Sequence, residues 1–162
     1  MIFTDVHRGA VPWPDFWTGD FICDIDGTVA DLTHRLHWIR TKPKNWDAFK
    51  AGVSNDEPIW SVIRTVQDLQ ASGCVMIMCS GRNESQRKET EDWLEEVGLH
   101  PVRLYMRKDG DYRGDDIVKE ELLNQIIKDG FNPELCFDDR DRVVAMWRKR
   151  NLECIQVAEG DF

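Results

Sequence analysis

The chain has 162 residues, of which 41% are hydrophobic and 31% are charged, the composition of an ordinary globular domain with a sizeable core. It contains no apolar run long enough to cross a membrane and no signal peptide, so we expect a cytoplasmic protein without membrane partners. The formal net charge of −9 argues against extended binding to duplex DNA, which needs a basic surface. A small phosphorylated substrate or one nucleic-acid end is compatible with this charge.

Residues 1–19 are predicted to form an irregular N-terminal arm, because Pro12-Trp13-Pro14 interrupts any regular structure. The rings of Trp13, Phe16 and Trp17 are expected to pack this arm onto the body of the chain. Contact with a second copy of the chain is the alternative, and it leaves a homo-oligomer open.

The stretch Phe21-Ile22-Cys23-Asp24-Ile25-Asp26-Gly27-Thr28 follows the arm. Its apolar start predicts a buried parallel strand over residues 21–24, and its glycine permits a sharp turn afterwards. Asp24 and Asp26 therefore lie at the carboxyl end of a buried strand, where unpaired charges are costly. We expect them to hold a cation or to take part in a reaction.

Residues 30–56 are predicted to form a small helical insert after this strand. Thr33 is available as the N-cap of its first helix, Pro43 ends that helix, and Asn45 caps a second short one. The insert is rich in cations and aromatic residues: His34, Arg35, His37, Trp38, Arg40, Lys42, Lys44, Trp46 and Phe49.

The rest of the chain alternates regularly between helix and strand. Helices are predicted over residues 56–73, 83–98, 117–130 and 143–147, and strands over residues 75–79, 102–105, 135–137 and 154–157. Alternation of this kind predicts an α/β fold, with a parallel sheet between two helical layers in a three-layer α/β/α arrangement. In such sheets, ligands bind beyond the carboxyl ends of the strands. The five cysteines show no Cys-x-x-Cys spacing and are expected to be reduced.

Polar side chains stand at the carboxyl ends of several predicted strands. They are Asp24 and Asp26 after the first strand, Ser80 after the second, Lys119 early in the helix before the fourth strand, and Asp138 and Asp139 after the fourth. The topology places all of them on one rim of the sheet.

This set of side chains suits phosphoryl transfer. Asp24 would attack phosphorus to form an aspartyl-phosphate, and Asp26 would act as general acid and base. Lys119 would offset the repulsion between the nucleophile and the phosphate, while the Ser80 hydroxyl would hold phosphate oxygens. Carboxylate oxygens are the ligands that Mg²⁺ prefers. The metal ligands that we expect are Asp24, Asp26, Asp138 and Asp139.

The chain resembles the haloacid dehalogenase (HAD) superfamily from residue 20 to residue 162. Asp24-Ile25-Asp26-Gly27-Thr28 resembles its first motif, Ser80 its second, Lys119 its third and Asp138-Asp139 its fourth. An acid at position 26 is typical of the phosphatase branch. The resemblance implies a Rossmann-like HAD phosphatase domain over residues 20–162, with residues 30–56 as a small cap inserted after the first strand.

A narrower resemblance is to the 3′-phosphatase domain of phage-type polynucleotide kinase–phosphatases. It is carried by Ser80-Gly81-Arg82, Met106-Arg107, Gly110-Asp111-x-Arg113, Asp115-Asp116-Ile117-Val118-Lys119-Glu120-Glu121, Asp138-Asp139-Arg140, Val143-Val144-x-Met146-Trp147-Arg148 and Gln156-Val157-Ala158-x-Gly160-Asp161-Phe162. That family uses Mg²⁺ to remove 3′-phosphates from nucleic-acid ends and nucleotides, which also makes a phage origin plausible. The chain has no Gly-x-x-x-x-Gly-Lys-Ser/Thr loop, so the resemblance implies the phosphatase and not the kinase.

Substrate contacts are expected from the rim and from the cap. An aromatic residue of the cap would stack on a nucleobase, or else build the miniature core of the cap itself. The candidate substrate-binding residues are Thr28, Arg35, Trp46, Gly81, Arg82, Arg107 and Arg140.

The amino-acid sequence leaves two other functions open. The acidic charge and the single-domain size favour a phosphatase of free nucleoside 5′-monophosphates, whereas the long motif match favours 3′-ends. A non-catalytic nucleotide-binding module is the third reading. It is opposed by the presence of Asp24, Asp26, Lys119 and Asp138 together.

Overall fold

A five-stranded parallel sheet forms the centre of the computed structural model, which describes residues 18–160. The strand order is β5-β4-β1-β6-β7, and each neighbouring pair is parallel. The strands are β1 (Asp20–Cys23), β4 (Val75–Asn83), β5 (Arg103–Arg107), β6 (Pro133–Asp138) and β7 (Glu153–Gln156). The strand that carries Asp24 at its end is therefore the central one.

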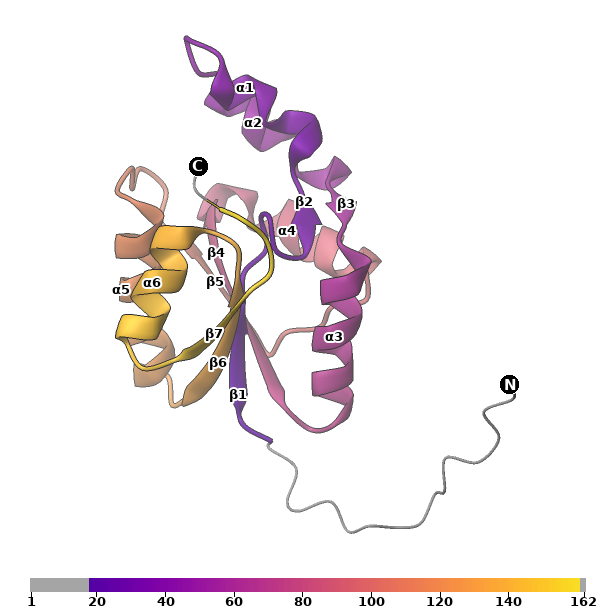
Figure 1. Ribbon diagram of the computed structural model, residues 1–162. Coiled ribbons are helices and arrows are strands. Elements are labelled where there is room, and N and C mark those ends of the chain that lie inside the picture. Colours follow the sequence, from indigo (N-terminus) through magenta and orange to yellow (C-terminus); the bar gives the residue numbers. More distant parts are fainter. Residues whose placement is uncertain (1–17, 161–162) are drawn as a thin grey trace, which may run out of the picture.

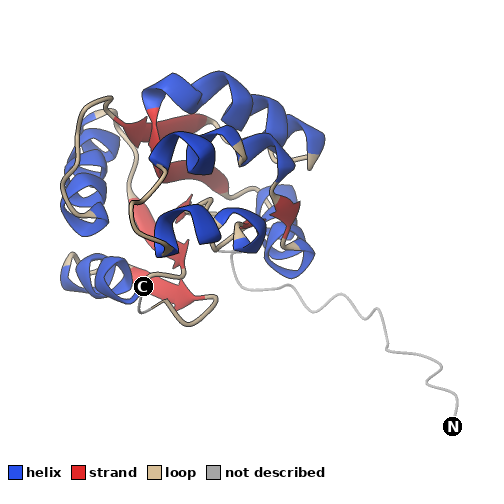
Figure 2. Ribbon diagram, turned by 90° about the horizontal axis from the view of Figure 1, so that it is seen from above, coloured by secondary structure: helices blue, strands red, loops and turns tan. Residues whose placement is uncertain are grey.

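Two helical layers cover the sheet. One face carries α3 (Trp60–Ala71) and α4 (Arg87–Glu96), and the other carries α5 (Asp115–Lys128) and α6 (Asp141–Lys149) (Figures 1 and 2). This is the predicted α/β/α arrangement. Among the described residues no helix has both the length and the apolar character that crossing a membrane requires.

Side-chain alternation explains why residues 21–23 of the central strand β1 are all apolar. On β1, Phe21 and Cys23 join the core beneath α3 and α4, while Ile22 joins the core beneath α5 and α6. Successive strand residues point to opposite faces, so a strand that is covered twice needs apolar residues throughout. All five cysteines lie in the described part and are free thiols.

Several predicted boundaries were wrong, and three of them have an identifiable structural reason. The helix expected from residue 56 begins at Trp60, because Glu57–Pro58 forms a short strand, β3, that pairs antiparallel with β2 (Ala30–Asp31); a residue before proline favours extended backbone. The second sheet strand continues to Asn83, with irregular pairing between Ser80 and Asn83. At the start of the insert, Thr33 is the first residue of the helical turn and the N-cap position is Leu32, while the Asp31 carboxylate accepts the Thr33 N–H at 2.8 Å.

The insert between β2 and β3 rises from the carboxyl end of the sheet (Figure 1). Asn45 caps its second helix as predicted, since its side chain accepts the Ala48 N–H at 3.0 Å. Of the predicted N-terminal arm, residues 1–17 lie outside the described residues, and so do its three aromatic side chains. The elements of the insert are η1 (Thr33–Arg35), α1 (His37–Arg40), α2 (Trp46–Ala51) and η2 (Val53–Asn55), with η3 (Glu84–Gln86) facing them from the body.

Candidate active site

The two central strands bring three buried carboxylates together. The β1–β6 ladder continues beyond β1, because the Asp24 N–H donates to the Phe137 carbonyl at 3.0 Å. Asp24 therefore ends beside Asp138, the last residue of β6, and Asp139 follows directly. One carboxylate oxygen from each aspartate lies within 4.8 Å of the other two, and all three residues are buried. We call Asp24, Asp138 and Asp139 the carboxylate cluster.

Lys119, from the second turn of α5, reaches into this cluster. Its Nζ lies 2.7 Å from Asp24 Oδ1 and donates to Asp138 Oδ2 at 2.8 Å. The indole N–H of Trp147, on α6, donates to the same Asp138 oxygen at 3.0 Å. The sequence pattern predicts Trp147 only as an apolar residue of a helix and does not predict its hydrogen bond to Asp138.

The carboxylate cluster has more negative than positive charge. Burial raises the pKa of Asp24 well above its ordinary value, Asp138 and Asp139 add to the rise, and Lys119 opposes it. Burial and Asp138 also raise the pKa of Asp139 to about 6. Three buried carboxylates with one lysine favour a further cation, and their oxygens are hard ligands of the kind that Mg²⁺ takes. The donor set therefore fits the magnesium ion that the sequence implies.

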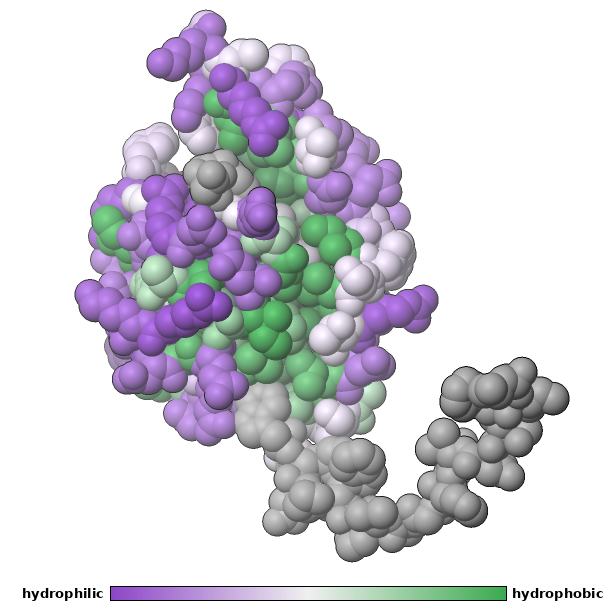
Figure 3. Space-filling view, in the orientation of Figure 1, coloured by the Kyte–Doolittle hydropathy of each residue, from purple (hydrophilic) through white to green (hydrophobic). Residues whose placement is uncertain are grey.

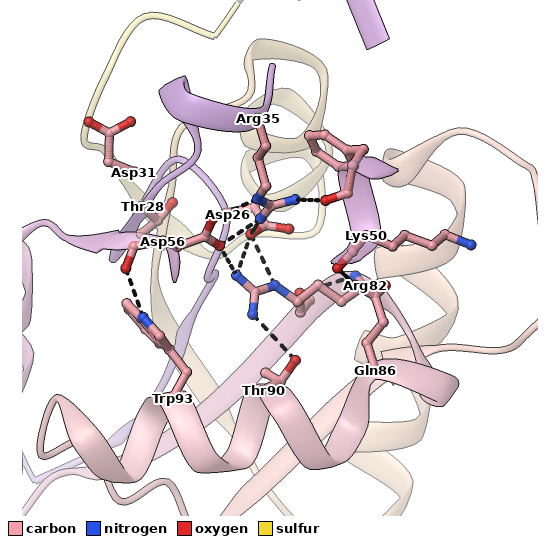
Figure 4. Close-up of polar contacts among 12 residues, drawn as sticks. Asp26, Thr28, Asp31, Arg35, Lys50, Asp56, Arg82, Gln86, Thr90 and Trp93 are labelled. Carbon is pink, nitrogen blue, oxygen red and sulfur yellow. Dashed lines mark hydrogen bonds and ion pairs between the residues drawn. The ribbon is translucent and has the colours of Figure 1, made fainter. Parts of the chain in front are cut away.

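Asp26 lies in a different environment, drawn in Figure 4. Its Oδ1 accepts from Arg35 Nη2 at 2.8 Å and from Arg82 Nη2 at 2.6 Å. Asp56 binds the same two arginines, at 2.6 Å from Arg35 Nε and 2.7 Å from Arg82 Nη2. Burial opposes ionisation of Asp26, but the two guanidinium groups outweigh it and lower its pKa. We call Asp26, Arg35, Asp56 and Arg82 the charge quartet.

Asp56 is the quartet member that sequence reasoning missed. It is predicted only as the start of a helix, but its side chain is fully buried and also contacts His34 Nε2 at 2.8 Å. From α4, Trp93 Nε1 donates to the Asp56 carbonyl at 2.9 Å, and Thr90 accepts from Arg82 at 3.3 Å. The only sequence signal was an acid at the point where the cation-rich insert returns to the body.

The aromatic residues of the insert divide into two kinds. The guanidinium of Arg35 lies over the Phe49 ring at 4.3 Å, and the Phe49 ring packs edge-on against Trp46 with centroids 6.0 Å apart. Phe49 is thus part of the packing inside the insert. Trp38 and Trp46 are 40% and 49% exposed, which leaves ring surface available to a ligand.

The two remaining arginines are held by Asp115, at the start of α5. Its two oxygens accept from Arg107 Nη2 and from Arg140 Nη1, the second at 2.9 Å. Arg107 Nε also donates to the Gly81 carbonyl at 2.9 Å. A Cβ at position 81 would lie 2.3 Å from an Asp115 oxygen, so this approach requires glycine.

A cavity of about 1110 Å³ opens over these groups and extends beneath the insert. Thr28 and Ser80 do not line it: the Thr28 hydroxyl donates to Asp24 Oδ2 at 3.3 Å, and Ser80 Oγ accepts the Arg82 N–H at 3.2 Å. Asp138 also lies behind the surface. The cavity is lined by the other predicted site residues, Asp24, Asp26, Arg35, Trp46, Gly81, Arg82, Arg107, Lys119, Asp139 and Arg140.

Comparison with known families identifies this arrangement. The model of the polynucleotide kinase PNKP phosphatase domain, a HAD family, matches residues 19–162. The chain belongs to this family. As a HAD phosphatase it is an enzyme with phosphatase activity, and the resemblance found in its motifs is confirmed.

Relatives of this phosphatase occur inside longer proteins. It is 31% identical over 147 residues to the "Putative bifunctional polynucleotide kinase/RNA ligase" of Autographa californica nuclear polyhedrosis virus, covering 90% of this chain and 20% of the viral protein. It is also similar to a chain of the Pnkp1/Rnl/Hen1 RNA repair complex, with 31% identity and a TM-score of 0.77, over 98% of this chain and 49% of that one. The phosphatase thus spans a fifth of one relative and about half of the other.

More distant structures share the fold alone. A hydrolase from Streptococcus pneumoniae TIGR4 has 14% identity and a TM-score of 0.63, over 88% of this chain and 94% of its own. A class C acid phosphatase from Bacillus anthracis has 17% identity and a TM-score of 0.63, over 90% of this chain and 68% of its own. These likenesses confirm the predicted Rossmann-like HAD fold.

Proposed function

We propose that this phosphatase is a Mg²⁺-dependent phosphomonoesterase that removes the 3′-phosphate from nucleic-acid ends or nucleotides through an aspartyl-phosphate. The proposal rests chiefly on the contact of Lys119 with both Asp24 and Asp138, beneath a cavity that several arginines line. Membership of the polynucleotide kinase phosphatase family supports the 3′ position. We also propose residues 20–162 as the phosphatase domain and residues 30–56 as its cap.

In the first step, a carboxylate oxygen of Asp24 attacks phosphorus and the bond from phosphorus to the 3′-oxygen breaks. Asp26 gives its proton to that departing oxygen. Lys119 stabilises the negative charge that builds up between nucleophile and phosphate. Arg35 and Arg82 keep Asp26 ionised in the free enzyme despite its burial. The incoming phosphate anion raises the proton affinity of Asp26, which takes up a proton from solvent as the substrate binds.

In the second step, Asp26 takes a proton from water and the water oxygen attacks the phosphorus of the aspartyl-phosphate. The bond to Asp24 breaks and inorganic phosphate leaves. Asp26 then loses its proton to solvent, because the two arginines favour its ionised form in the free enzyme. Asp26 must be ionised to accept this proton, and the arginines of the charge quartet favour its ionised form.

The carboxylate cluster would hold the magnesium ion. When bound, the ion would supply positive charge that offsets the repulsion between Asp24 and the phosphate. Asp26 is also expected as a ligand from the sequence, but its carboxylate contacts the arginines of the quartet. Proton transfer is therefore the role that we propose for its side chain.

Substrate contacts are proposed for the residues that line the cavity, and supporting roles for those behind it. Arg107 and Arg140 line the cavity and are proposed to bind phosphate, while Trp46 is proposed to stack on a base. Thr28 supports Asp24 from behind, and Gly81 leaves room for Asp115. Arg35 and Arg82 are proposed to contact phosphate while they hold Asp26.

A phosphatase of free nucleoside 5′-monophosphates is the second candidate, favoured by the net charge of −9. The test is phosphate release from a 3′-phosphorylated oligonucleotide, a nucleoside 3′-monophosphate and a set of nucleoside 5′-monophosphates, each with Mg²⁺ and with EDTA. We expect release from the 3′-phosphates with Mg²⁺ alone. Release from the 5′-monophosphates only would replace the first candidate by the second, and equal release in EDTA would contradict the magnesium requirement.

A further inference from the structure

Tyr112 is the most exposed of the large apolar side chains in the described part of the chain. Its ring is 91% exposed and lines the active-site cavity, from the segment between β5 and α5. This segment and the cap rise at the same end of the sheet (Figure 1). An aromatic ring displayed beside a catalytic cavity presents a face on which a planar group can stack.

The backbone on both sides of Tyr112 is fixed. Arg107 Nη1 donates to the carbonyl of Asp111 at 3.1 Å and to the carbonyl of Arg113 at 2.8 Å. Arg113 in turn binds the Asp111 carboxylate and bridges to Glu121 on α5. The ring is therefore carried by a supported turn, attached through Arg107 to the rim of the active site.

Cations gather at the tip of the cap, and two of them, Lys44 and Lys50, line the same cavity. The tip of the cap, residues 40–50, carries Arg40, Lys42, Lys44 and Lys50 but only one acid, Asp47, in a chain of net charge −9. Among the residues that the structure describes, these four cations have no ion-pair partner, and Lys44 lies over the Trp46 ring at 5.4 Å. Hydrophilic side chains also cover the far end of the cap in Figure 3. This local charge suits a strand of phosphates.

The size of the cavity also suits a strand of several nucleotides. Pockets for small molecules occupy about 300–1000 Å³, and this one measures about 1110 Å³ and is continuous from Asp24 to Tyr112 and the cap tip. It has room for more than one nucleotide. Cations interleaved with aromatic rings are the usual means of holding a single strand without reading its sequence.

We propose that Tyr112 and the cap tip bind a single-stranded polynucleotide, with a nucleobase on the 5′ side of the terminal nucleotide stacked on the Tyr112 ring. Phosphates of the same strand contact the cations of the cap tip. Tyr112 is thus a specificity-determining residue that makes this phosphatase prefer an oligonucleotide end over a mononucleotide. This inference rests on the proposed function for its substrate.

The test compares the wild type with Tyr112→Ala, Tyr112→Phe and the control Trp60→Ala, which removes an exposed aromatic residue outside the cavity. Binding of fluorescent single-stranded DNA and RNA ten-mers with a 3′-hydroxyl is measured by anisotropy. Phosphate release from the 3′-phosphorylated ten-mers and from a nucleoside 3′-monophosphate is measured in parallel. The 3′-hydroxyl strands report binding independently of catalysis.

We expect Tyr112→Ala to weaken binding of the ten-mers and to raise their KM by roughly 5- to 150-fold. The KM and kcat for the mononucleotide should stay unchanged, and Tyr112→Phe and Trp60→Ala should behave as wild type. Binding that depends on Tyr112 for DNA only, or RNA only, would identify the polymer.

Different results would contradict the inference about Tyr112 and the proposed 3′-phosphatase function. If Tyr112→Ala binds the ten-mers as tightly as wild type, or if wild type does not bind them, the inference is overturned. If the ten-mers bind through Tyr112 but their 3′-phosphates are not released, the inference stands and the proposed 3′-phosphatase function falls.

Discussion

The carboxylate cluster and the charge quartet are neighbours with opposite electrostatics. Asp24 and Asp26 are two residues apart, but burial and two further aspartates raise the pKa of the first, while two arginines, acting against burial, lower the pKa of the second. The cluster has three carboxylates and one lysine near them. The quartet has two carboxylates and two guanidinium groups.

This difference separates the proposed nucleophile, which lies in the cluster, from the proposed proton-transfer residue Asp26, which the arginines of the quartet hold. A site with an excess of buried negative charge is prepared to receive a cation and a phosphate, and is not optimised for stability. A balanced buried quartet is already satisfied, and removing one member leaves an unpaired charge. Mutations in the two regions should therefore affect different observables.

The largest effect is expected for Asp24→Asn. The amide cannot act as the nucleophile, so turnover should fall by at least roughly a thousandfold. The free energy of unfolding should not decrease, because the change removes one of three crowded carboxylates. Steady-state kinetics and urea unfolding measure the two quantities. Unchanged phosphatase activity in this variant would disprove the aspartyl-phosphate mechanism.

Asp56→Asn is expected to lower stability. It leaves Arg35 and Arg82 with only one carboxylate between them, and we expect a loss of about 3–5 kcal/mol in the free energy of unfolding. Asp92→Asn is the matched control, because Asp92 pairs with exposed Lys88 at 2.6 Å on the surface of α4. If the two variants are equally stable, the charge quartet does not contribute to the stability of the fold.

Magnesium should stabilise the wild type through the carboxylate cluster. At a concentration one hundred times the dissociation constant, the linkage contributes about 2.7 kcal/mol, seen as a higher Tm. The Asp139→Asn variant should lose most of this shift in Tm, because Asp139 belongs to the carboxylate cluster but forms no ion pair with Lys119. An equal shift in Asp139→Asn would place the ion elsewhere.

The smallest effect is expected for Trp46→Ala. Removing the half-exposed ring should raise the KM for 3′-phosphorylated nucleotides by roughly fivefold or more, with kcat little changed. Trp60→Ala, which is similarly exposed at 51% but lies outside the cavity, should leave both constants unchanged. A fall in kcat alone would instead indicate a role for Trp46 in closing the cap.

The sequence predicted the cluster better than the quartet, for a physical reason. Asp24 and Asp138 stand at the ends of apolar strands, and parallel strands necessarily bring their carboxyl ends to one edge. The partnership of Asp56 with Arg82 depends on how the insert folds back onto the body, which no local pattern encodes. Pro58 misled the prediction of the helix start for the same reason, since its strand pairs across the whole insert.

The paired strands β2 and β3 are the point where the chain enters and leaves the proposed cap. Ala30 lies opposite Pro58, so the chain leaves the body and returns to it at adjacent positions, and the central sheet is complete without the segment between them. The insert can therefore change in length or sequence without altering the strands that hold Asp24 and Asp138. A changed insert must still supply an arginine in the place of Arg35 for Asp26 and Asp56.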